Sequence, residues 1–288
     1  MRFPADVIVV GDALLDVYVA PSEPMRPGGD VPATVRLGPG GQGANVAVRL
    51  TRRGVRVRLA CALADDSAGR LVREALEADR VELDAAATDA TGAVVIVVDS
   101  DGERTMLSRR ASLLPRRVED APWTVISGYV LLEDGDLDWR GGGRRAVLGC
   151  ALPTGAEGTW WRRANELQPT VVILNADEAQ AIGADARALA LESGALVVVT
   201  DRDGAVATSS DPDLRPSRVT VERAAALDTT GAGDAFAAAF LAELHDRSEG
   251  SDVDIDRALT AGLELATQVA GVSGAQARVP LEQERSRA

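Results

Sequence analysis

A glycine-rich turn that leads into a helix is the strongest chemical feature of this sequence. Residues 228–236 read DTTGAGDAF and continue into an alanine-rich segment that favours a helix. Four consecutive amides should therefore point outward where the helix begins, those of Gly231, Ala232, Gly233 and Asp234. Oriented N–H groups at the positive end of a helix dipole stabilise charge on a transferred phosphoryl group. The turn is predicted to be an anion hole.

Asp234 puts a carboxylate into the same turn, where it would repel an anion unless it has a task of its own. An attacking hydroxyl group must lose a proton, and a carboxylate beside the anion hole is a natural general base. The alternative is that Asp234 only caps the helix, since aspartate is favoured at helix N-caps. The length of the full DTTGAGDAF string favours the base.

The DTTGAGDAF string resembles the C-terminal signature of the ribokinase-like (PfkB) carbohydrate kinase family. GPGGQGAN at 38–45 resembles the N-terminal signature of that family, and NADE at 175–178 is similar to its NxxE element. The resemblance implies ATP-dependent phosphorylation of a hydroxyl group on a small sugar or sugar acid. Asp234 would be the base, and the amides of Gly231–Gly233 would hold the transferred phosphate.

The resemblance also assigns residues to the nucleotide and its metal ions. Asn175 and Glu178 would organise Mg²⁺ and the nucleotide phosphates, with Glu178 acting through water, as suits a cation that keeps several of its waters. The alternative is that Asn175 ends a strand and Glu178 begins a helix, where the dipole favours an acid. Thr200, Gly204 and Thr230 would border the nucleotide, and Asp228 would take part in a K⁺ site that some family members need.

Substrate binding falls, by the same resemblance, to Asp16, Gly40, Gly41 and Asn45, with Asp12 as a further candidate. Asp16 follows the first predicted strand, where α/β proteins place ligands, and its carboxylate can accept two sugar hydroxyls. Glycine at 40 and 41 permits close approach of a polyol, and Asn45 offers a donor and an acceptor. The structural alternative is a tight turn at 40–43 and a helix cap at Asn45, with Asp12 bracing the loop.

Three arginines follow a predicted hairpin in GERTMLSRR, namely Arg104, Arg109 and Arg110. If they point into the cleft, they favour an acidic or phosphorylated sugar, and Arg104 is the one assigned to the substrate. The alternative is that they lie on the surface.

Two departures from the family pattern leave undetermined which hydroxyl compound accepts the phosphate and which nucleotide donates it. Gln42 stands where many members that act on simple pentoses have lysine. The loop 200–204, TDRDG, is one residue shorter than usual and lacks an inner glycine, and its two aspartates would repel a triphosphate unless they face solvent.

The elements that must position these residues alternate between strands and helices. Apolar runs that predict buried strands are Val7–Val10, Val55–Ala62, Val94–Asp99, Val125–Leu132, Val171–Asn175 and Leu196–Thr200. Helical spacing of alanine and leucine predicts helices at Gly69–Ala78 and Asp177–Leu191. The alternation predicts one α/β domain over 1–288 with a mostly parallel central sheet and helices on both faces. Segments 17–37 and 91–107, the second with a hairpin turn at Asp101-Gly102, should form a small β-sheet lid.

The net charge limits the classes of molecule that the protein can be expected to bind. The formal charge is −13, which argues against a protein that binds nucleic acid or an anionic membrane. Val7–Val10 is too short for a signal peptide core or a membrane span, so a cytoplasmic location is expected.

Two rival functions stay open. A nucleoside kinase of the same fold would be expected to have more aromatic residues to stack a base than the 3% found. A sugar or nucleotide sensor without catalysis would explain the altered 200–204 loop, although it would have no reason to keep Asp234. The resemblance also suggests a homodimer formed through the small sheet.

Overall fold

The computed structural model describes residues 4–99, 104–110, 117–119, 121–133, 138–139, 143–183, 185–211, 215–221, 230–246, 254–271 and 276. Within these ranges no helix is long and apolar enough to cross a membrane.

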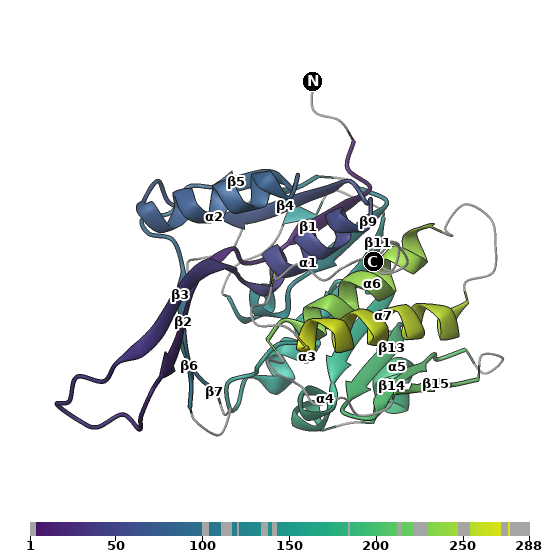
Figure 1. The fold of residues 1–288 in the computed structure, drawn as a ribbon. Coiled ribbons are helices and arrows are strands. Elements are labelled where there is room, and N and C mark those ends of the chain that lie inside the picture. Colours follow the sequence, from purple (N-terminus) through teal and green to yellow (C-terminus); the bar gives the residue numbers. More distant parts are fainter. Residues whose placement is uncertain are drawn as a thin grey trace, which may run out of the picture.

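A large twisted sheet forms the centre of the molecule (Figure 1). Its nine described strands are, in spatial order, β15 (Ser217–Thr220), β14 (Gly204–Thr208), β13 (Leu196–Asp201), β12 (Val171–Asn175), β11 (Arg144–Leu148), β9 (Trp123–Ile126), β1 (Val7–Val10), β4 (Val57–Ala62) and β5 (Glu82–Ala86). The strands from β5 to β13 run parallel, whereas β14 and β15 add an antiparallel edge. The predicted mostly parallel sheet is confirmed.

Helices cover both faces of this sheet. One face carries α1 (Gln42–Arg52), α2 (Ser67–Ala78), α6 (Ala232–Asp246) and α7 (Ile255–Ala270). The other face carries the 3₁₀ helix η1 (Gly128–Leu132), α3 (Glu157–Glu166), α4 (Ala176–Ile182) and α5 (Ala186–Ser193). Because side chains alternate along a strand, Val7 and Val9 enter the first core while Ile8 and Val10 enter the second. This explains why β1 is apolar at every position.

A separate four-stranded sheet projects from the large one (Figure 1). Its strands are β3 (Ala33–Gly40), β2 (Leu14–Pro21), β6 (Ala93–Val98) and β7 (Arg104–Arg109), in that order. β6 and β7 pair antiparallel from Val98 opposite Arg104, as the predicted hairpin requires, and its turn at 101–102 lies outside the described residues. A short pair, β8 (Arg117–Val118) with β10 (Asp138–Trp139), completes the described strands.

The predicted strand Val125–Leu132 is wrong beyond its first two residues. β9 ends at Ile126, and the chain turns into η1, where the Val130 N–H donates to the Ser127 carbonyl at 3.0 Å. A Cβ atom on Gly128 would lie 2.4 Å from the Leu148 carbonyl oxygen, and the indole of Trp160 donates to the Gly128 carbonyl at 2.9 Å. Packing against the next strand and α3 therefore ends β9 early.

The predicted helix Asp177–Leu191 is two helices. Gly183 ends α4 in the left-handed conformation, with φ 82°. Asp185 then starts α5 as its N-cap, accepting the Ala188 N–H at 2.8 Å. Apolar spacing continued across this break, whereas the local capping residues decided the boundary.

Candidate active site

The first turn of α6 presents a row of amides at the carboxyl edge of the parallel strands. Gly231 precedes the helix with φ 76°, a conformation that favours glycine. The first bond of the helix runs from the Ala235 N–H to the Gly231 carbonyl at 2.9 Å. The N–H groups of Ala232, Gly233 and Asp234 come before it, so they lack carbonyl partners within the helix. A Cβ atom on Gly233 would meet no described atom within 4 Å, which leaves room for a ligand over the turn.

Asp234 is the third residue of α6 and not its N-cap. Its Oδ2 accepts a hydrogen bond from Nδ2 of Asn45 at 2.7 Å, which ties α6 to α1. Asn45 is the fourth residue of α1, so it does not cap that helix either. Both capping alternatives therefore fail, and the two side chains meet across 189 positions of sequence.

The pKa of the Asp234 carboxyl is raised from 3.8 to about 7. Burial is the main cause, the hydrogen bond from Asn45 opposes it, and the nearby carboxylates of Asp12, Glu178 and Asp16 add to the rise. A carboxylate with a pKa in this range is well matched to accepting a proton near neutral pH.

Asp12, at the end of β1, is fully buried and held from several sides. Its carboxylate accepts the Gly43 N–H at 3.2 Å and forms an ion pair with Arg110, whose guanidinium lies 3.4 Å over the ring of Tyr129. Arg110 thus reaches from the end of β7 into the site. Asp12 braces the loop at the start of α1, as the structural alternative expected.

Asp16 and Gly40 lie together on the small sheet. A Cβ atom on Gly40 would come within 2.1 Å of the Asp16 carboxylate, so glycine makes room for that side chain. Burial, with a contribution from Asp12, raises the pKa of Asp16 to about 6. Gly41 has φ 98° and packs against the Asp12 carbonyl, where a Cβ atom would lie 2.7 Å from the oxygen. These two glycines serve close packing of the protein chain itself.

Gln42 has both ends of its amide bonded within the protein. Nε2 donates to the Gly149 carbonyl at 2.7 Å, and Oε1 accepts from the Ser127 hydroxyl at 2.7 Å and the Gly128 N–H at 3.0 Å. The side chain therefore fastens the start of α1 to the ends of β9 and β11. Ser127 had no sequence signal, because the side chains that its hydroxyl contacts, Gln42 and Asp12, are 85 and 115 residues away in the sequence.

Asn175 and Glu178 form a reciprocal capping box at the start of α4. The Asn175 N–H donates to Oε2 of Glu178, and the Glu178 N–H donates to Oδ1 of Asn175, both at 2.8 Å. A Cβ atom on Gly149 would lie 2.0 Å from Oε2, so this glycine admits the carboxylate, and burial raises the pKa of Glu178. The helix-start alternative is thus realised.

The donor set near Glu178 fits a hard cation that keeps most of its waters. Oε2 is engaged in the capping box, so a hydrated ion would be bound through the other oxygen of Glu178. Among the described residues no cluster of three or more acidic, histidine or cysteine side chains could hold a metal by itself.

Arg104 and Arg109 of β7 differ in what they contact. Nη1 of Arg104 donates to the Thr230 hydroxyl at 2.5 Å, which brings the small sheet onto the residue before the glycine-rich turn. Nη2 of Arg109 donates to the Thr91 carbonyl at 2.7 Å, at the base of the small sheet. Arg104 and Arg110 therefore point toward the site, whereas Arg109 does not.

The segment 200–204 is a tight hairpin between β13 and β14. The Asp203 N–H donates to Oδ1 of Asp201 at 2.7 Å, and both aspartates are exposed. A Cβ atom on Gly204 would lie 2.1 Å from the Val219 carbonyl oxygen, so β15 requires glycine at 204. The Thr200 hydroxyl donates to the Leu174 carbonyl at 3.4 Å. Asp228, assigned to a cation, lies outside the described residues.

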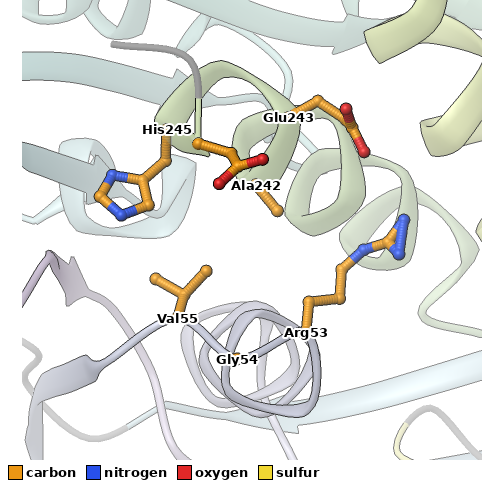
Figure 2. A pocket seen from close by; sticks show the side chains of 7 residues that line it. Arg53, Gly54, Val55, Ala242, Glu243 and His245 are labelled. Atoms are coloured by element: carbon orange, nitrogen blue, oxygen red, sulfur yellow. The ribbon is translucent and has the colours of Figure 1, made fainter. Parts of the chain in front are cut away.

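A cavity of about 290 Å³ lies between the far ends of α1 and α6 (Figure 2). Arg53, Glu243 and His245 are among its lining side chains. Asn45 and Asp234 are in the first turns of these two helices, so this cavity is separate from the candidate active site.

Comparison with known proteins defines the class, which is a kinase of the ribokinase fold. More narrowly, the chain belongs to the pfkB family of carbohydrate kinases, whose model matches residues 4–126 and 160–282. The predicted family and fold class are confirmed.

Individual relatives agree with this assignment. A ribokinase from Mus musculus is 24% identical in an alignment of 259 residues that covers 82% of this chain and 80% of the mouse protein. The structure of ribokinase from Thermotoga maritima superposes with a TM-score of 0.77 at 20% identity, covering 98% of each chain. Aminoimidazole riboside kinase from Salmonella enterica, solved with aminoimidazole riboside and an ATP analogue, gives a TM-score of 0.74 at 21% identity, covering 98% of this chain and 99% of that one.

Replacing Asp234 by Asn is predicted to stabilise the free protein above pH 7. The folded pKa of about 7 exceeds the ordinary 3.8, so protonation of Asp234 favours folding at acidic pH, and this stabilisation is lost as the pH rises through 7. Asparagine stays neutral at every pH. Because Asp234 is partly buried, the expected gain in the free energy of unfolding at pH 8 is on the order of 1 kcal/mol. Melting temperatures between pH 4.5 and 8.5 should be higher for Asp234→Asn at pH 8, and the difference should close toward acidic pH.

The control is Asp65→Asn, because the Asp65 side chain is 98% exposed. A difference between Asp234→Asn and the unmodified protein that stays constant across the pH range would contradict the raised pKa.

Proposed function

We propose that this protein transfers the γ-phosphoryl group of ATP to a hydroxyl group of a small sugar or sugar acid. The observation that carries the proposal is the 2.7 Å hydrogen bond between Asn45 and Asp234 in the first turn of α6. It holds a carboxylate with a raised pKa directly beside the amides of Gly231–Gly233. The match to the pfkB family and the ATP analogue bound by the Salmonella kinase support the choice of donor and reaction.

Each residue has a defined part in this proposal. An oxygen of Asp234 accepts the proton of the attacking hydroxyl group while Asn45 holds Oδ2 in place. The amides in the first turn of α6 stabilise charge on the transferred phosphoryl group. Asp16 accepts hydrogen bonds from other hydroxyl groups of the substrate. The small sheet acts as a lid, with Arg104 of β7 and Arg110 just after β7 in contact with the body.

Metal ions would neutralise charge at the site and would not themselves take part in the proton transfer. Mg²⁺ would be held by Glu178 through water, with Asn175 and Thr200 at the same strand ends, and would neutralise phosphate charge. Carbonyls at Asp228 and Thr230 would hold K⁺ if the enzyme uses it.

A nucleoside kinase is the second candidate. The strand register aligns Tyr18, Ile96 and Met106 in one row, on the same face of the small sheet as Asp16. Ile96 is buried and Arg36 lies 4.5 Å over the Tyr18 ring, so half-exposed Met106 is the apolar side chain of this row on which a base could pack beside a ribose held by Asp16. The riboside bound by the Salmonella kinase supports this class as well.

ADP release with a panel of acceptors separates the candidates. The panel is ribose, fructose, 2-keto-3-deoxygluconate, adenosine and pseudouridine, and turnover is expected with a sugar or sugar acid.

Asp234→Asn should retain the fold yet lower kcat by two or more orders of magnitude, because no group is left to take the proton. Near-normal turnover in that variant would refute the base. Stabilisation by a sugar with no turnover on any acceptor would favour a sensor.

The second face of the small sheet supports a homodimer. The strand register aligns apolar residues on this outer face, and these are Val17, Val19, Val35, Leu37, Val95, Val97 and Leu107. Val35, Leu37 and Leu107 are each more than half exposed. An apolar patch of this kind on an otherwise charged protein is typical of a surface that another copy covers.

Light scattering at tens of micromolar should give the mass of a dimer. Leu37→Glu combined with Leu107→Glu should give a monomer, since two charges would be buried without partners. Leu191→Glu is the control, because Leu191 is equally exposed but lies on α5. A monomeric mass for the unmodified protein would rule out the dimer.

A further inference from the structure

A chain of hydrogen bonds continues from Asp234 beyond Asn45. Nδ2 of Asn45 donates to Oδ2 of Asp234 at 2.7 Å, and Oδ1 of Asn45 accepts from Nε2 of Gln276 at 3.0 Å. Gln276 is 231 residues away from Asn45 in the sequence. Both ends of the Asn45 amide are therefore engaged, one by the catalytic candidate and one by Gln276.

The orientation of the Asn45 amide determines whether a hydrogen-bond donor or an acceptor faces the Asp234 carboxylate. An amide has a donor end and an acceptor end of nearly the same shape, so it can rotate by half a turn at little steric expense. With its NH₂ group toward Asp234, it donates to the carboxylate and favours the charged form. With its oxygen toward Asp234, it would repel the carboxylate. The donor from Gln276 satisfies the oxygen only in the first orientation.

Gln276 is itself anchored to the same helix. Nη1 of Arg52 donates to the Gln276 carbonyl at 2.8 Å, and the Arg52 guanidinium binds both carboxylate oxygens of Asp79 at 2.9 and 2.8 Å. Asn45 and Arg52 are seven residues apart on α1 and so share a face of the helix. One face of α1 thus holds both the side chain and the main chain of Gln276.

We propose that Gln276 is a positioning residue for the base, which it serves by fixing the Asn45 amide with its donor group toward Asp234. The inference rests on the proposed function only in that Asp234 is the base. Gln276 touches neither substrate nor reacting atoms in this proposal, and it acts through Asn45.

The charged groups around Asp234 make this donor important. They are Asp12 at the end of β1, Asp16 on β2, Glu178 on α4 and Arg49 on α1. The three carboxylates and burial favour the protonated form of Asp234, whereas the Asn45 hydrogen bond and the Arg49 guanidinium favour the charged form. Loss of that bond should therefore raise the pKa of Asp234 further and remove the base at neutral pH.

Two substitutions test the proposal in the free protein. Gln276→Glu has the same shape but presents acceptors, so the Asn45 amide should turn its NH₂ group toward residue 276 and its oxygen toward Asp234. Gln276→Leu only removes the donor and should have a smaller effect in the same direction. Gln168→Glu is the matched control, because Gln168 is exposed and precedes β12 at the opposite edge of the sheet.

The primary measurement is the carboxyl ¹³C titration of Asp234 by NMR, with its signal assigned by its loss in Asp234→Asn. We expect the Asp234 midpoint to move up by about one pH unit or more in Gln276→Glu, less in Gln276→Leu, and not in Gln168→Glu. The added charge of Gln276→Glu can raise the Asp234 midpoint by itself, so the decisive variant is Gln276→Leu, which removes the donor and adds no charge. An unchanged or lowered midpoint in Gln276→Leu would overturn the proposal.

Kinetics separate this inference from the proposed function. In Gln276→Glu, kcat at pH 6.5 should fall about tenfold relative to the unmodified enzyme and recover as the pH is raised. A shifted Asp234 midpoint together with an unshifted pH profile of kcat would leave the positioning role intact and refute Asp234 as the base.

Discussion

The hydrogen bond between Asn45 and Asp234 is the interaction on which the site depends. It joins α1 and α6, which begin at the carboxyl edge of the parallel sheet, and it partly offsets the burial of a carboxylate among three others. Without a donor at this point, Asp234 would be neutral over a wider pH range, and a neutral carboxyl group accepts no proton. The close packing of Gly41 and Gly43 on the loop at Asp12 sets where α1 starts and hence where Asn45 lies.

The two faces of the small sheet differ in composition and in what they contact. The face that carries Asp16 also carries Tyr18 and Arg104, and it is tied to the body through the Arg104 contact with Thr230 and, from the end of β7, the ion pair of Arg110 with Asp12. The opposite face is apolar and partly exposed. Strand β2 has valine side chains on its outer face and Asp16 and Tyr18 on the face toward the site. This explains why valine alternates with polar residues along this strand.

Local patterns predicted the fold well, because apolar runs and helical spacing act over a few residues. Apolar runs failed at Gly128, where contact with the Leu148 carbonyl ends the strand, and at the break between α4 and α5, where the capping residues Gly183 and Asp185 outweigh the apolar spacing. Motif spacing predicted Asp234 and the amides of α6, but not that Asn45 bonds the carboxylate. The hydrogen bonds of the Gln42, Ser127 and Gln276 side chains could not be predicted, because their partners are 80 or more residues away in the sequence. Such partners follow from topology and not from any local property of the sequence.

The pH dependence of kcat/KM for ADP formation tests the central claim most directly. With the best acceptor and the unmodified enzyme, the account predicts that kcat/KM falls tenfold per pH unit below an apparent pKa of about 7, because the free enzyme must hold Asp234 ionised. A profile that stays flat down to about pH 5, as expected of a carboxylate with its ordinary pKa, would contradict it.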